Sequence, residues 1–168
     1  MEDKKVIIPL TIGTSKDFLA IINQVTDWIN RIDEKIGADL LYIIDGDFLE
    51  DAILADDEFF DTATKRKMIT DAVVKEGEKI AGEIKAVFSE QGIEGSTKVL
   101  IGNPLEEIVR AARQTSAIAI ISQTLPSGLL NVAPCPVIVF APKKKSIRFI
   151  DAVTSWFGAR SKTAPLRT

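Results

Sequence analysis

Short apolar runs alternate with longer amphipathic stretches along the first 142 residues of the chain. Each apolar run is too short for a helix and has the length of a β-strand. The amphipathic stretches place apolar residues three and four positions apart, which predicts helices. The predicted strands are residues 5–10, 38–45, 94–101, 117–121 and 137–140. The predicted helices are residues 15–36, which Gly37 would end, residues 62–91, which Gly92 would end, and a third that Asn103-Pro104 opens.

The last two predicted strands are apolar throughout, as strands buried on both faces are. Only residues 122–133 separate the first of them from Pro134-Cys135-Pro136, so the crossover has room for about one helical turn around Leu129. Because parallel sheets usually bury both faces, these runs predict a parallel sheet. The fold class is therefore α/β.

Composition limits the classes of function that this chain can have. The chain has 168 residues, 46% of them hydrophobic, and predicts one domain with a sizeable core. Neither a signal peptide nor an apolar run of membrane-spanning length is evident, and a single cysteine suits a reducing compartment, so a cytoplasmic location is expected. The sequence contains no histidine, which removes Ser-His and Cys-His nucleophile pairs and histidine metal ligands. We expect no enzymatic activity.

The charge divides the chain into an acidic body, residues 1–142, and a basic tail, residues 143–168. The tail carries a net charge of +6, against −9 for the body. Residues 146–160 predict an amphipathic helix with one apolar face. That face contains Phe149, Ile150, Val153, Trp156 and Phe157. The helix could pack on its own domain or on a dimer mate, lie on a membrane surface as a peripheral contact, or bind a protein partner; nucleic acid is disfavoured because the body is acidic.

The second half of the body resembles a known family. Gly102-Asn103-Pro104 opens a helix, an apolar strand follows, and Ala133-Pro134-Cys135-Pro136-Val137 precedes the last strand. Together these features resemble the universal stress protein family, whose order of elements agrees over residues 4–142. The resemblance implies a doubly wound, five-stranded, Rossmann-like parallel sheet of order 3-2-1-4-5 that usually dimerises. Many members of the family bind ATP.

This chain departs from the ATP-binding pattern of that family at two places. ATP-binding members carry Gly-x-x-Gly, nine residues, then Gly-Ser/Thr in the crossover before the last strand, whereas residues 122–133 are too few and contain only Gly128. Thr11 occupies the position where those members have an aspartate. We therefore predict a non-catalytic regulatory or stress-response protein with no ATP and no other cofactor. The alternatives are a divergent ATP site built from Gly13, Gly102 and residues 122–128, and an enzyme similar to the wider nucleotide α-hydrolase group.

Ligands of open α/β sheets bind at the carboxyl ends of the strands, at the switch point of the strand order. The residues predicted to line such a crevice are Thr11, Gly13, Ile44, Gly102, Ser122 and Thr124. The acidic stretch 45–61 lacks the spacing of a calcium loop, so no metal is expected, and Ile53, Leu54, Phe59 and Phe60 within it predict a lid over the crevice. The last strand would expose an uncharged edge and so predicts a homodimer, the alternative being an edge covered by the tail. The predicted dimer edge is Val137, Ile138, Val139 and Phe140.

Overall fold

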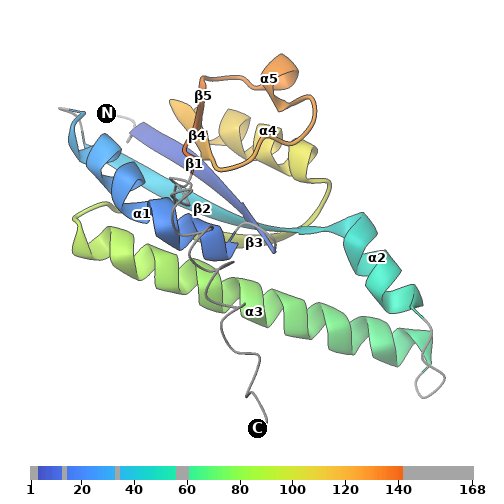
Figure 1. Cartoon of the computed structure of the whole chain (residues 1–168). Coiled ribbons are helices and arrows are strands. Elements are labelled where there is room, and N and C mark those ends of the chain that lie inside the picture. The colour runs from blue at the N-terminus through green and yellow to red at the C-terminus, as the bar shows by residue number, and fades with distance from the viewer. Residues whose placement is uncertain (1–3, 13–14, 33–34, 56–60, 142–168) are drawn as a thin grey trace, which may run out of the picture.

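The computed structural model describes residues 4–12, 15–32, 35–55 and 61–141. Within them the chain forms one five-stranded, all-parallel sheet with helices on both faces (Figure 1). The strand order β3-β2-β1-β4-β5 confirms the predicted doubly wound topology. The strands are β1 (Lys4–Thr11), β2 (Ile36–Asp45), β3 (Thr97–Gly102), β4 (Ala119–Ser122) and β5 (Val137–Val139). The helices are α1 (Ser15–Asn30), α2 (Gly46–Leu54), α3 (Thr62–Glu90), α4 (Pro104–Gln114) and α5 (Leu129–Val132).

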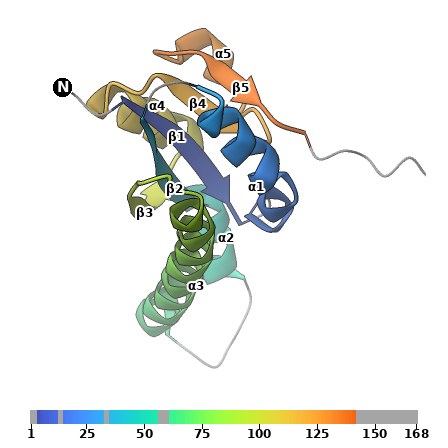
Figure 2. The ribbon, with the colours of Figure 1, turned by 90° about the vertical axis from the view of Figure 1, so that its left-hand side faces the viewer.

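Alternating residues of the central strands feed two separate hydrophobic clusters, one on each face of the sheet (Figure 2). Ile8 and Ile44 point toward α1 and α3, whereas Ile7 and Ile43 point toward α4 and α5. All four side chains are fully buried. The apolar runs are therefore continuous because these strands are buried on both faces, as predicted from the sequence.

The boundary between α1 and β2 differs from the prediction. Helix α1 ends at Asn30, not at residue 36, and Ile36 begins β2, where it pairs with Lys4 of β1. Gly37 thus lies inside the strand and does not end the helix. A Cβ atom at Gly37 would lie 3.0 Å from the backbone oxygen of Glu94. The position of Ile36 fits both the apolar spacing of the preceding helix and that of the following strand. Pairing with β1 places it in the strand.

Helix ends follow the sequence signals closely. The Asn103 side chain accepts a hydrogen bond from the Glu106 amide at 3.3 Å, and Pro104 occupies the first turn of α4. The Asp61 carboxylate likewise accepts from the amides of the first turn of α3. At the other end of α3, Gly92 takes a φ of 75°, the left-handed conformation that terminates helices. The predicted ends of α3 are confirmed.

Helix α2 and the first half of α3 extend together beyond the sheet as an arm (Figure 1). The buried residues of α3 begin only at Gly77, so its first half contributes no buried side chain. The arm is tied together by Arg66, which donates two hydrogen bonds to the Glu50 carboxylate, one of them 2.8 Å long. The expected lid is therefore wrong in part: Ile53 is buried in the core, and Leu54 is exposed. Phe59 and Phe60 lie outside the described residues.

The predicted tail helix, residues 146–160, also lies outside the described residues, as does the rest of the segment 143–168. Across the part of the chain that the structure describes, no helix combines the length and the apolar character needed to cross a membrane.

Candidate functional site

A cavity of about 410 Å³ opens at the carboxyl ends of β1 and β2. Two strand ends, the sheet side of α2 and the start of α4 enclose it. Its lining residues are Thr11, Ile12, Ile43, Asp45, Phe48 and Pro104. This is the edge of the sheet where open α/β proteins bind ligands, and the cavity lies next to the switch point between β1 and β4. We call it the carboxyl-end cavity.

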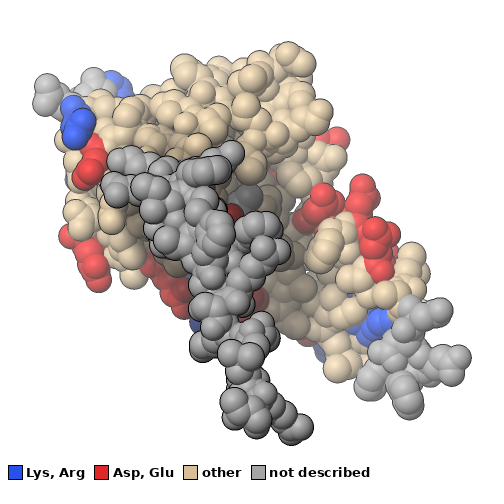
Figure 3. Space-filling view, viewed as in Figure 1, with Lys and Arg blue, Asp and Glu red and all other residues tan. Residues whose placement is uncertain are grey.

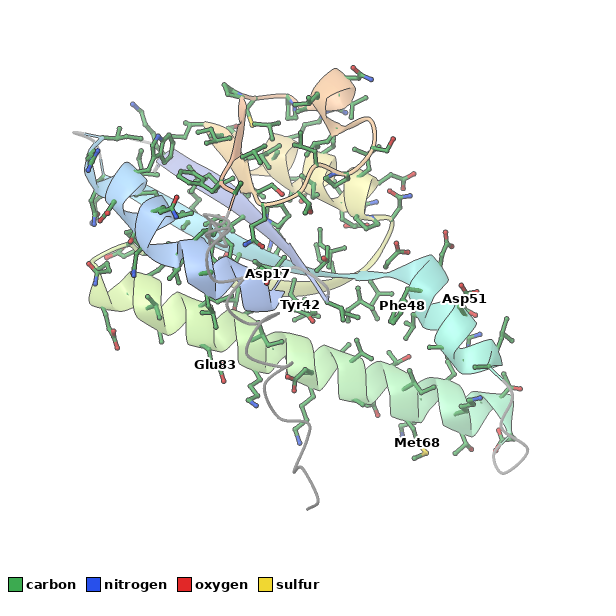
Figure 4. All side chains as sticks on the ribbon, viewed as in Figure 1. Asp17, Tyr42, Phe48, Asp51, Met68 and Glu83 are labelled. Carbon is green, nitrogen blue, oxygen red and sulfur yellow. The ribbon has the colours of Figure 1, made fainter. Side chains whose placement is uncertain are left out.

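The walls of the carboxyl-end cavity are mostly apolar, and two of them are open to solvent. Phe48 is 54% exposed and Ile12 is 41% exposed. Figure 4 places Phe48 on the side of α2 that faces the sheet and Asp51 farther out on the same helix. Exposed aromatic and branched side chains at a concave mouth favour an apolar occupant, because covering them removes apolar surface from water.

The charge around the cavity is negative. Of the described residues that line it, Asp45 is the charged one, and its carboxylate accepts a hydrogen bond from the Asp47 amide at 3.0 Å, which caps α2. Helix α2 adds Asp47 and Asp51, whereas its Glu50 is paired with Arg66 of α3. Acidic side chains accordingly gather on and around α2 in Figure 3. Among the described residues, no basic side chain lines the cavity.

Of the predicted crevice residues that the structure describes, one lines this cavity. Thr11 lines it, at the end of β1. Ile44 does not, because it is buried on the opposite face of the sheet, against α1 and α3. Its neighbour Ile43 takes that place. Gly13 lies outside the described residues.

The other predicted crevice residues lie elsewhere at the same edge. Gly102 ends β3, where a Cβ atom would approach the Glu107 carboxylate at 3.1 Å. Ser122 is buried at the end of β4, and its hydroxyl donates to the carbonyl oxygen of Thr124. Thr124 itself is exposed. None of the three lines the cavity.

Gln123 was missed by the sequence interpretation. It follows β4 directly, and both polar atoms of its side-chain amide are buried without a hydrogen-bond partner. A buried amide without partners costs about 1–3 kcal/mol, so such groups often mark the position of a binding partner. The sequence feature that could have identified Gln123 is its position as a polar residue immediately after an apolar strand.

The connection between β4 and β5 is short and contains one glycine, Gly128. Gly128 takes a φ of 84° in a turn that the Leu129 amide closes by donating to the Pro126 carbonyl at 3.0 Å. The single-turn helix α5 follows, as predicted. Helix α5 has only four residues, and no glycine-rich loop precedes it.

A second cavity, of about 370 Å³, lies at the opposite edge of the sheet, near the amino ends of the strands. It borders a buried polar contact, in which Asp39 accepts hydrogen bonds from the Ser96 amide at 2.9 Å and from Lys5 at 3.3 Å. Burial by itself raises the pKa of Asp39, but these hydrogen bonds outweigh it and hold the pKa below the ordinary 3.8. The Asp39 carboxylate thus links β2 to Lys5 of β1 and to Ser96, which directly precedes β3.

No group of three or more potential ligands for a metal ion occurs within the described ranges. Cys135 packs against the cluster under α4, and burial raises the pKa of its thiol. A raised pKa lowers the reactive thiolate fraction, which agrees with a packing role for this residue.

The predicted dimer edge is divided between core and surface. Ile138 and Phe140 pack on the cluster under α1, where Phe140 meets Trp28 edge-to-face at 6.5 Å, and Val137 packs on the cluster under α4. Val139 is 46% exposed. Strand β5 pairs with β4 alone, so in the described structure its outer edge is free. The homodimer stays a prediction.

The fold and this cavity define a doubly wound α/β protein with a small-molecule-sized crevice at the carboxyl ends of its strands. No family model matches the chain, and no curated protein matches it in sequence. Solved structures do match. The hypothetical protein MJ0577 has a TM-score of 0.66 at 18% identity, over 86% of this chain and 99% of that one.

Two universal stress proteins match in the same way. The one from Burkholderia pseudomallei has a TM-score of 0.60 at 20% identity and covers 83% of this chain and 96% of its own. The one from Archaeoglobus fulgidus, solved in complex with dAMP, has a TM-score of 0.56 at 14% identity. The match covers 83% of this chain and 98% of the Archaeoglobus chain. The chain therefore has the fold of universal stress proteins.

Proposed function

We propose that this protein is a non-catalytic regulatory module of the universal stress protein type that does not bind ATP. It acts as a homodimer that presents its surface to a partner. The observation that carries the proposal is the connection between β4 and β5, which has one glycine and a four-residue helix. Without a run of amides that the backbone can bring close to phosphates, a triphosphate has no binding loop.

Two further features support the absence of ATP. The carboxyl-end cavity carries Asp45 and no described basic side chain, so a polyphosphate would meet like charge there. Thr11, at the end of β1, is a neutral residue and lacks the two acceptor oxygens that a carboxylate would offer to a ribose. The lack of histidine supports a binding role over catalysis.

A nucleotide is the second candidate, and the structural neighbours favour it. The Archaeoglobus protein was solved with dAMP and an Arabidopsis universal stress protein with AMP, the latter at a TM-score of 0.53 and 14% identity. A monophosphate needs fewer phosphate contacts than ATP, and the cavity is large enough for a base. Under this alternative the orphan amide of Gln123 would be a natural hydrogen-bond partner for the ligand.

Isothermal titration calorimetry of the full chain separates the two candidates. ATP with magnesium and AMP are titrated separately into the same protein, with adenosine as the control that lacks phosphate. The proposal expects no saturable heat with ATP up to millimolar concentration. Saturable micromolar binding of ATP would overturn it, and binding of AMP that is tighter than binding of adenosine would establish the second candidate.

A further inference from the structure

The carboxyl-end cavity combines three properties that rarely occur together without a function. It is concave, its mouth exposes Phe48 and Ile12, and the charged residue among its described lining is Asp45, with Asp47 and Asp51 nearby on α2. A large exposed aromatic side chain at the mouth of a cavity indicates a surface that another group covers. The negative rim restricts that group to one that is apolar and positively charged.

The chain contains such a group in its own sequence. Residues 143–168 carry seven lysines and arginines against one aspartate. Residues 146–160 predict a helix whose apolar face includes Phe149, Trp156 and Phe157. An apolar face framed by basic residues is the chemical complement of an apolar mouth framed by acidic ones.

The segment also starts at the correct edge of the sheet. Since β5 is parallel to the other strands, it ends at the same edge of the sheet as the cavity, where the Phe140 amide donates to the carbonyl oxygen of Ser122 at 3.0 Å. Neighbouring strands lie about 4.8 Å apart, so β2 is roughly 14 Å from β5 across β4 and β1. Six extended residues span about 20 Å, and a helix of residues 146–160 would be about 22 Å long. The segment therefore reaches the cavity.

We propose that residues 143–168 of this chain dock on the carboxyl-end cavity, with the apolar face of the predicted helix 146–160 against Phe48 and Ile12. The basic residues of the segment then lie near the negative charge of Asp45 and α2. The cavity is then the docking site of this segment. This inference stands apart from the proposed function, because docking of the tail does not require ATP to be excluded.

The alternatives place the segment differently. An anionic membrane would bind the lysines, but the body carries −9 and would be repelled from the same surface. Alternatively, the segment of one chain could dock on the cavity of a second copy and the reverse. Docking would then depend on protein concentration. Both are outcomes of the test.

Hydrogen–deuterium exchange of the full chain, at a dilution where it is monomeric and without lipid, tests the inference. An isolated helix of about 15 residues is marginal in water, so protection of amides 146–160 reports docking. Phe48→Lys removes the apolar contact and adds a repelling charge, and we expect that protection to fall about tenfold or more. Leu130→Lys is the matched control, because Leu130 is 66% exposed on α5, and it should leave protection unchanged.

A reciprocal variant keeps the test valid if Phe48→Lys impairs folding. Trp156→Ser lies in the tail and should accelerate exchange of residues 47–54 in α2 to a similar extent. Raising the salt concentration should weaken protection of the tail as well, because the attraction is between exposed charges. Four results would each overturn the inference: an unprotected tail, protection that survives both variants, protection that appears only as the dimer forms, or protection that requires anionic vesicles.

Discussion

Gly77 of α3 lies directly against the ring of Tyr42 in β2. A Cβ atom at position 77 would be 2.6 Å from Cδ1 and 2.8 Å from Cε1 of that ring. Tyr42 is 2% exposed and cannot move outward without disturbing the core. Glycine is therefore required here by the close approach of helix and sheet, although it weakens a helix.

A pair of matched substitutions in α3 tests this contact. We expect Gly77→Ala to lower the free energy of unfolding by about 1–2 kcal/mol, because overpacking costs more than the helix propensity of alanine returns. Gly82→Ala should raise it by about 0.5–1 kcal/mol, since a Cβ atom there would meet nothing within 4 Å. Urea unfolding of the two variants measures both. Stabilisation by both substitutions would show that Tyr42 does not constrain position 77.

Asp39 gives the fold a pH dependence that can be measured. Its folded pKa lies below the ordinary 3.8, so its stabilising effect is complete above the unfolded pKa and is lost as the pH falls through the folded value. Asp39→Asn should cost about 1–2 kcal/mol at pH 7, since a buried charged hydrogen bond to Lys5 is lost. The difference from the wild type should shrink as the pH falls below 3.8 and through the lower, folded pKa.

Free energies of unfolding at pH 7, 5 and 3 measure this dependence. Asp71→Asn, at an exposed position of α3, serves as the control and should differ from the wild type by less than about 0.5 kcal/mol. Parallel stability curves for the wild type and Asp39→Asn would contradict the assignment, because they would mean that Asp39 titrates alike in the folded and unfolded chain.

The strands and their direction could be predicted because burial on both faces leaves a strong signal. The run around Ile120 is apolar without interruption, which indicates a strand buried on both faces and hence a parallel sheet, and the crossover after it has room for a single helical turn. The ends of α3 were predictable for a local reason, since Asp61 caps one end and Gly92 adopts a positive φ at the other. These signals act within a few residues and need no knowledge of the rest of the chain.

The candidate site could not be predicted to the same degree, because it depends on register and on the direction of a helix. Ile43 and Ile44 are equivalent in sequence, and a shift of one residue decides which of them faces the cavity. Phe48 was not predicted at all, because its position follows from the way α2 leaves the end of β2. The orphan amide of Gln123 is a tertiary property of the same kind.

The proposed homodimer makes a specific prediction about β5. If the outer edges of two β5 strands pair about a twofold axis, each Val139 lies close to the same region of its mate. Val139→Lys would then bring like charges together and should raise the Kd of the dimer about tenfold or more. Val139 is 46% exposed, so the substitution leaves the core of the monomer intact.

Sedimentation velocity over a concentration series measures this effect against a matched control. Met68 is 54% exposed on α3, on the arm that extends beyond the sheet (Figure 4), and Met68→Lys adds the same charge at a position distant from β5. The wild type and Met68→Lys should sediment as dimers at concentrations where Val139→Lys is monomeric. A wild type that remains monomeric throughout the series would remove the dimer from the proposed function, and a dimer indifferent to Val139→Lys would move the interface to another surface.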